Sequence, residues 1–130
     1  ANIEGCTFTL DTSSGFDGYC IYYYGNNGST VNVKNSTFAT AGKGICIYSE
    51  SAKAYNLNVD KCSFTSSDSA TDKAAIQMHT ELGISGNVKI TETTATGFAD
   101  INGGLWNELN NNTKVATDKF DIWVDGTQVH

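Results

Sequence analysis

The chain contains 130 residues, and its 8 basic side chains, all of them lysine, are outnumbered by 14 acidic ones, which gives a formal charge of −6. This acidic balance argues against nucleic acid as a partner, because such binding begins with Lys and Arg neutralising phosphates. No apolar run reaches the roughly 18 residues of a membrane-spanning helix, so we expect no membrane insertion. Thr, Asn, Gly and Ser supply 53 residues and proline is absent, a composition poor in helix formers and rich in strand and turn residues.

A repeated motif begins within the first residues of the chain. It places an aliphatic residue five positions before a phenylalanine, with Cys or Ser between them. The motif occurs at 3–8, 33–38 and 59–64, and more loosely from 88 to 98. We therefore expect stacked ladders of equivalent side chains, such as Phe8, Phe38 and Phe64, in the protein interior.

A second motif, apolar–polar–apolar, follows each copy of the first after a polar loop. It occurs at 18–22, 44–48, 75–78 and 104–106, and its starts are 26, 31 and 29 residues apart. Short strands that recur at such a period, with no room for crossover helices, pair in parallel when the chain winds as a solenoid with roughly 4.8 Å between rungs. The handedness of parallel connections makes this coil right-handed. An antiparallel sandwich is the alternative, but it gives no reason for whole motifs to repeat.

The Val-x-x-(Cys/Ser)-x-Phe and Gly-Ile-x-Ile elements resemble the rung pattern of the right-handed parallel β-helix proteins, the pectate-lyase-like superfamily. The resemblance covers residues 1 to about 110 and implies an all-β parallel β-helix of four to five rungs with an irregular C-terminal cap. This superfamily includes polysaccharide lyases, glycoside hydrolases, tailspikes and non-enzymatic adhesins, so the resemblance leaves the chemistry open. The absence of Arg departs from pectate lyases, which use a basic residue as the proton acceptor.

The last segment departs from the repeat. Residues 120–124 alternate as a strand and Asp125-Gly126 forms a turn. We therefore expect one domain over 1–130, with repeat rungs at 1–106 and a terminal rung or cap at 107–130, as a segment of a longer protein. No cap precedes Ile3, so we expect the N-terminal end to stack on further rungs, on a second polypeptide or on a copy of the chain.

The second motif predicts a functional surface on the outside of the coil. If Gly44 aligns with Ala75, the aliphatic residues point inward and the intervening residues point outward. Aromatic rings beside carboxylates suit a sugar, which needs apolar stacking and hydrogen-bond acceptors. The expected carbohydrate-binding residues are Tyr22, Tyr24, Tyr48, His79, Gln77 and Trp106. Glu50 and Glu81, on adjacent rungs, are the candidate catalytic pair because glycoside hydrolysis needs two nearby carboxyl groups; a merely solvated face is the alternative.

No metal-ligand motif is present, and no resident cofactor is expected. The polar loops contain acidic residues that could bind a calcium ion, although their spacing does not match an EF-hand. These residues are Asp11, Asp17, Asp68 and Asp72.

Two pairs of cysteines bear on disulfide formation. Cys6 and Cys62 occupy equivalent sites two rungs apart, with Ser36 between them, beyond disulfide reach. We expect both to be free and unreactive, buried as small apolar residues in a ladder. Cys20 and Cys46 are assigned to adjacent positions of one column, where the sequence leaves a disulfide between them undecided.

These features favour an extracellular or cell-surface microbial protein that engages carbohydrate. One hypothesis is a segment of a polysaccharide- or oligosaccharide-degrading enzyme. The alternative is a non-catalytic adhesin or a tailspike-like stalk. The sequence contains no catalytic signature of any one family, so whether the chain is an enzyme stays open.

Overall fold

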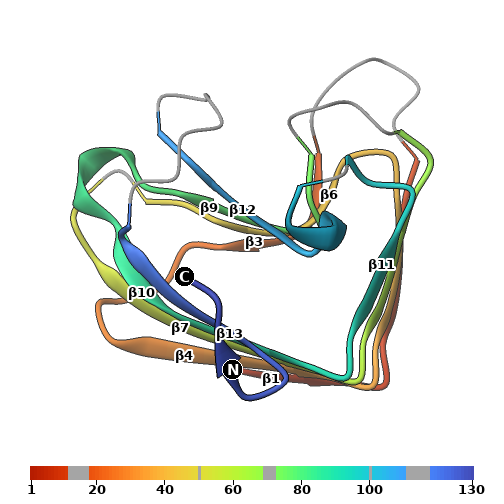
Figure 1. Ribbon diagram of the computed structural model, residues 1–130, viewed down its shortest axis with the longest axis horizontal. Coiled ribbons are helices and arrows are strands. Elements are labelled where there is room, and N and C mark those ends of the chain that lie inside the picture. Colours follow the sequence, from red (N-terminus) through yellow and green to blue (C-terminus); the bar gives the residue numbers. More distant parts are fainter. Residues whose placement is uncertain (12–17, 50, 69–72, 100, 111–117) are drawn as a thin grey trace.

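The computed structural model describes residues 1–11, 18–49, 51–68, 73–99, 101–110 and 118–130, which form three sheets (Figure 1). Sheet A contains β1 (Asn2–Glu4), β4 (Ser29–Lys34), β7 (Ala54–Asp60), β10 (Ser85–Thr91), β13 (Phe120–Val124) and β14 (Thr127–Gln128). Sheet B contains β2 (Thr7–Leu10), β5 (Thr37–Thr40), β8 (Ser63–Ser66) and β11 (Thr94–Thr96). Sheet C contains β3 (Tyr19–Tyr23), β6 (Lys43–Ile47), β9 (Ile76–His79) and β12 (Trp106–Leu109).

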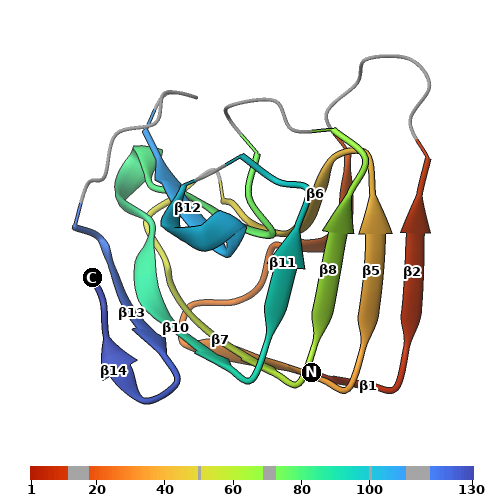
Figure 2. The same cartoon turned by 45° about the vertical axis from the view of Figure 1, so that its right-hand side comes forward.

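The three sheets form the walls of a parallel β-helix. Each strand pairs in parallel with the equivalent strand of the next coil, and the one antiparallel pair among the described strands joins β13 to β14. Followed from β1 in Figure 1, the chain turns anticlockwise while later coils come toward the viewer, as Figure 2 also shows, so the coil is right-handed. The predicted fold class is therefore confirmed, and the antiparallel sandwich is excluded.

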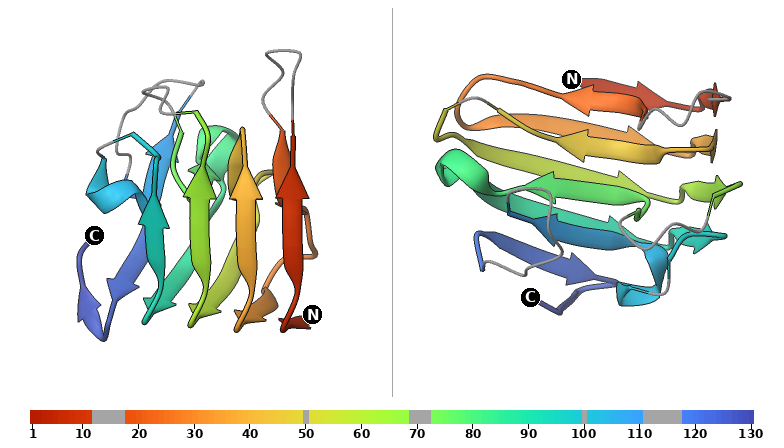
Figure 3. Two further views of the ribbon diagram at one scale, coloured as in Figure 1. Left: turned by 90° about the vertical axis from the view of Figure 1, so that its right-hand side faces the viewer. Right: turned by 90° about the horizontal axis from the view of Figure 1, so that it is seen from above.

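Equivalent side chains stack along the inside of the coil. Ile3, Val33, Val59, Ile90 and Val124 share one register position of sheet A. In Figure 3 the strands of successive coils lie side by side, which brings such positions into line. Because the side chains alternate between faces with a period of two, the aliphatic residues of the sheet A strands fill the interior and the intervening residues face outward.

The predicted phenylalanine ladder lies inside sheet B. Phe38 is fully buried and stacks on both neighbours, with ring centroids 4.8 Å from Phe8 and 4.3 Å from Phe64. Ala95 takes the next place, since it pairs with Phe64. Phe98, which the looser fourth repeat suggested as the ladder residue, packs against the core outside this column.

A single residue in the left-handed region makes the bend from sheet A to sheet B. This residue is Gly5, Asn35, Lys61 and Glu92 in successive coils, with φ of 64°, 47°, 53° and 44°. Gly and Asn adopt this conformation readily, whereas for Lys and Glu it costs roughly 1–2 kcal/mol. The stacking of coils thus imposes the same bend even where the local sequence does not favour it.

The C-terminal end of the interior is closed by a buried carboxylate. Glu108 continues the column of Met78 and is fully buried. Its carboxylate accepts hydrogen bonds from the backbone N–H of Phe120 at 2.7 Å and of Asp118 at 3.2 Å, and lies 2.8 Å from His130 Nε2. Glu108 therefore ties the segment around β13 to the last coil.

The N-terminal end is more open. β1, β2 and β3 are each the outermost strand of their sheet. Ile3, Phe8 and Ile21 are partly exposed there, although their partners in the next coil are buried. The helices among the described residues are two short 3-10 turns, η1 (Glu81–Gly83) and η2 (Asn102–Gly104); none is long and apolar enough to cross a membrane.

Candidate functional site

A cleft of about 500 Å³ lies on the outside of sheet C. Its lining residues are Tyr19, Tyr22, Tyr48, His79 and Glu81. The first two belong to β3 and His79 ends β9, whereas Tyr48 directly follows β6 and Glu81 begins η1. Successive coils thus bring together residues that are up to 62 positions apart in the chain.

The end of β9 determines how the polar side of the cleft is built. Ile76 and Met78 point into the core, so the alternating Gln77 and His79 face outward. The strand then stops at Thr80, whose backbone N–H and hydroxyl both donate to the carbonyl of Leu109, at 2.7 and 2.9 Å. This anchored bend leads into η1 and places Glu81 beside His79.

Gln77, His79 and Glu81 form a hydrogen-bonded chain. Gln77 Nε2 lies 3.2 Å from His79 Nε2, and His79 Nδ1 lies 3.2 Å from Glu81 Oε1. Burial lowers the pKa of His79, although the Glu81 carboxylate opposes this shift. A neutral imidazole that accepts from Gln77 and donates from Nδ1 to Glu81 fits both contacts.

The second carboxylate oxygen of Glu81 is the unusual atom of this cleft. Within the described part of the chain, Glu81 Oε2 is buried and has no hydrogen-bond partner. Leaving a buried polar atom unpaired costs about 1–3 kcal/mol, more for a charged group. The cleft is therefore suited to a ligand that donates a hydrogen bond at this point.

Aromatic rings form the rest of the cleft. Tyr22 stacks on Tyr19 at 5.5 Å between ring centroids and lies 6.2 Å from Tyr48. Tyr48 meets the His79 ring edge-on at 5.5 Å. Lys43 Nζ lies 5.5 Å from the centre of the Tyr19 ring. The cleft thus combines extended apolar faces with one carboxylate.

The alignment of the first coil differs from the prediction. Tyr22 pairs with Cys46, which pairs with Gln77, so β3 is shifted by two residues from the predicted columns. Cys20 and Cys46 consequently do not share a column. All four cysteines are free.

The four cysteines differ in how far their thiols are exposed to solvent. Burial raises the pKa of Cys46 to about 12, and Cys62 is also buried. Cys6, at the open end, is exposed, so the prediction that it is shielded in a ladder is wrong.

Three residues expected at the site lie elsewhere. Trp106 pairs with Ile76 and points into the core, with 7% of its surface exposed. The predicted alignment was one residue off in this coil, and a one-residue slip reverses the face of every side chain. Gln77 faces outward as predicted but is fully buried, where it contacts His79 instead of solvent. Tyr24 is 49% exposed beside Lys53 and stacks on Tyr22 at 6.3 Å between ring centroids, but it does not itself line the cleft. Glu50 lies outside the described residues.

Two residues near the cleft were missed from the sequence. Tyr19 is the first residue of β3 and pairs with Lys43. The period-two pattern assigns both to the inward side, so alternation alone could not place them at the cleft. Their position at the start of the sheet C strands was the available signal, because such residues lie at a corner of the coil.

The acidic loops do not form a metal site among the described residues. Asp68 is paired with Lys73 at 2.6 Å, and no group of three His, Cys, Asp or Glu side chains converges within the described ranges. Asp17 and Asp72 lie outside those ranges.

The fold defines this chain as a parallel β-helix protein with an aromatic cleft on one outer face. Comparison with protein-family models, with curated protein sequences and with solved structures found no match. Function must therefore be argued from the cleft itself.

Proposed function

We propose that the chain is a carbohydrate-binding segment of a secreted or surface-attached β-helix protein, and that the cleft on sheet C holds the sugar. The observation that carries this proposal is the buried, unpartnered Glu81 Oε2 beside the rings of Tyr22 and Tyr48. A sugar presents hydroxyl donors on its edges and apolar C–H faces, and these match the two halves of the cleft.

The dimensions and charge of the cleft support a small neutral saccharide unit. Small-ligand sites usually measure about 300–1,000 Å³, and this cleft measures about 500 Å³. Among the described lining residues, Glu81 is the one acidic residue. A sugar hydroxyl that donates to Glu81 Oε2 would supply the missing hydrogen bond, while the fixed His79 keeps the carboxylate oriented.

The described lining supports binding better than hydrolysis. Glycoside hydrolysis generally uses two carboxyl groups roughly 5–9.5 Å apart, and the described lining contains one. That carboxylate is also engaged by His79. We therefore propose sugar binding as the role of the described lining. Glu50, the other candidate carboxylate, lies outside the described residues, so cleavage is examined in a separate assay.

The test begins with a glycan array, followed by calorimetric titration of the best ligand. We expect Tyr48→Ala to weaken binding by about 1–3 kcal/mol, the usual cost of losing one well-placed aromatic. Tyr24→Ala is the comparison variant, because Tyr24 is an exposed tyrosine that does not line the cleft and reaches it only by stacking on Tyr22, at 6.3 Å between ring centroids. Its affinity should stay within about twofold of the unchanged chain.

Folding and product analysis complete the design. Urea unfolding should show that both variants remain folded at the titration temperature. Equal loss of affinity in Tyr48→Ala and Tyr24→Ala, or no glycan bound at all, would contradict the cleft as the sugar site. New reducing ends on prolonged incubation with the bound glycan would establish an enzyme instead of a binding segment.

A further inference from the structure

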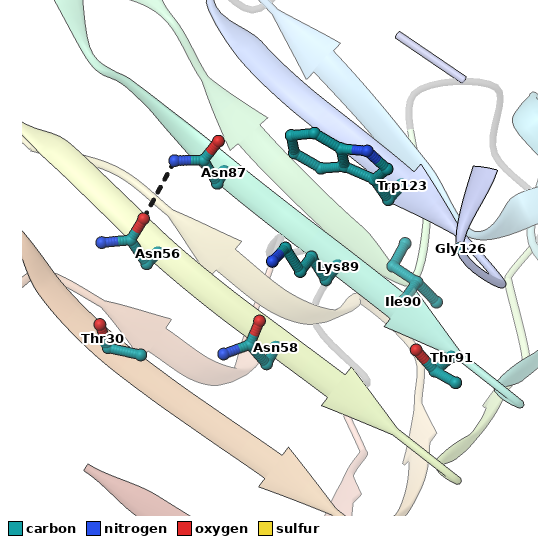
Figure 4. A pocket seen from close by; sticks show the side chains of 9 residues that line it. All are labelled: Thr30, Asn56, Asn58, Asn87, Lys89, Ile90, Thr91, Trp123 and Gly126. Atoms are coloured by element: carbon teal, nitrogen blue, oxygen red, sulfur yellow. Dashed lines mark hydrogen bonds between the residues drawn. The ribbon is translucent and has the colours of Figure 1, made fainter. Parts of the chain in front are cut away.

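Sheet A lies across the coil from sheet C (Figure 1), and its outer face contains a second pocket, which Figure 4 shows from close by. It measures about 710 Å³ and shares no lining residue with the cleft. Its residues come from β4, β7, β10 and β13, with Gly126 from the turn that follows β13. They are Thr30, Asn56, Asn58, Asn87, Lys89, Ile90, Thr91, Trp123 and Gly126.

Two ladders of asparagine side chains lead into this pocket. In one, Asn58 Nδ2 donates to Asn32 Oδ1 at 2.8 Å, and Asn32 Nδ2 donates to Asn2 Oδ1 at 2.9 Å. In the other, Asn87 Nδ2 donates to Asn56 Oδ1 at 3.1 Å. Each amide thus donates toward the preceding coil.

This common direction orients the last amide of each ladder. Among the described hydrogen bonds, the Oδ1 atoms of Asn58 and Asn87 accept none, while their Nδ2 atoms are held by the ladder. Figure 4 shows both side chains on the pocket surface beside Lys89 and Trp123. The pocket therefore presents two carbonyl oxygens whose orientation is fixed before any ligand binds, which lowers the entropic cost of binding.

An ammonium and an indole ring continue the first ladder. Lys89 pairs with Asn58, and Trp123 pairs with Lys89. Lys89 Nζ lies 5.7 Å from the centre of the indole ring, within the range of a cation–π contact. The charge is therefore held next to a flat apolar surface.

The charge of the lining distinguishes this pocket from the cleft. Among the described lining residues, Lys89 is the one charged residue and none is a carboxylate. The whole chain, in contrast, has a net charge of −6. A ligand with a negative charge next to a hydroxylated ring would find its complement here and not at Glu81.

We propose that the outer face of sheet A binds a saccharide that carries a carboxylate, with Trp123 stacking on the sugar ring, Lys89 pairing with the carboxylate, and Asn58 and Asn87 accepting its hydroxyls. Uronic and sialic acids share this chemistry. The inference does not depend on the cleft, because the two sites have no residue in common.

The test uses three probes on the whole chain: a galacturonic acid trisaccharide, sialyllactose and, as the neutral control, lactose. We expect at least one acidic probe to bind more tightly than lactose, and its affinity to fall as salt is added. Lys89→Gln should weaken that probe roughly three- to fivefold, as for an exposed ion pair, and reduce the salt dependence. Lys34→Gln is the matched control, since Lys34 is an exposed lysine at the end of β4, outside the pocket.

The aromatic contribution is tested separately. Trp123→Ala should weaken the same probe by about tenfold or more, and Trp123→Phe should recover part of the loss because a ring remains. The acidic probe that binds shows whether the pocket takes a uronic acid or a sialic acid. The proposal is overturned if lactose binds as well as both acidic probes, if Lys89→Gln and Lys34→Gln behave alike, or if Tyr48→Ala abolishes binding of the acidic probe.

Discussion

The phenylalanine ladder gives the sharpest prediction about stability. Phe38 is fully buried between two rings, whereas Phe8 is partly exposed and stacks on one. Truncating a buried phenylalanine to alanine costs about 3–5 kcal/mol. Each stacked pair contributes about 0.5–1.5 kcal/mol beyond area burial. Phe38→Ala, which loses two stacked neighbours, should therefore lie near the upper end, at about 4–5 kcal/mol.

Phe8→Ala provides the internal comparison. Phe8 is less completely buried than Phe38 and has one stacked neighbour instead of two, so we expect a smaller cost of about 1.5–2.5 kcal/mol. Urea unfolding followed by circular dichroism measures both values, provided that the slope m stays constant between variants.

The ratio of the two losses in unfolding free energy, for Phe8→Ala and Phe38→Ala, tests whether the first coil is exposed at its outer end. Equal destabilisation by Phe8→Ala and Phe38→Ala would refute the open N-terminal end, because it would mean that Phe8 is covered in solution. The sequence predicts such a covering by further rungs, a second polypeptide or a copy of the chain. Repeating the comparison over a dilution series distinguishes the copy, since its contribution depends on concentration.

Three further predictions concern single groups. Glu108→Ala should destabilise the fold by about 2–4 kcal/mol in urea unfolding, because it leaves the Phe120 N–H without its acceptor and His130 without its partner; an unchanged midpoint would contradict its role at the C-terminal end. In a thiol titration of the native chain, Cys6 should react first and Cys46 last, since Cys6 is exposed while burial raises the pKa of Cys46 to about 12; the reverse order would refute the assigned burial. Burial lowers the pKa of His79 below its unfolded value of 6.5, so the unfolded state binds the proton more readily. Stability should fall as pH decreases below about 6.5, and His79→Gln should reduce that loss in pH-dependent unfolding.

The interior of the coil could be predicted from the sequence because its signal is a spacing. Ile3, Val33 and Val59 recur with a phenylalanine at a fixed distance, and the structure stacks them as expected. A period of two separates inward from outward residues within each strand. The repeat over the chain then specifies parallel stacking, since equivalent strands must lie one above another.

The outer face of sheet A could have been found by the same alternation. Asn58, Lys89 and Trp123 each lie between two inward aliphatic residues. The alternation marks them as an outward column, but it does not reveal their function. That the amides donate in one direction and leave acceptors at the pocket is a property of the stacked coils alone.

The alignment of β3 could not be predicted, for a definite reason. Cys20, Tyr22 and Tyr24 all face outward in either alignment, because a shift of two residues preserves the face of every side chain. The hydrophobic pattern is the same in both cases, and only pairing with β6 selects between them. Trp106 shows the opposite case, in which a shift of one residue moves a side chain from the surface to the core.

The chemistry of the cleft was likewise decided by the tertiary structure. The sequence identified Tyr48, His79 and Glu81 as candidates from their place in the repeat. Their burial, the lowered pKa of His79 and the unpartnered oxygen of Glu81 arise only when neighbouring coils remove these groups from water. Periodicity therefore determined which residues face outward, and the packing of one coil on the next decided which of them form a site, because solvent exclusion depends on contacts between residues far apart in the chain.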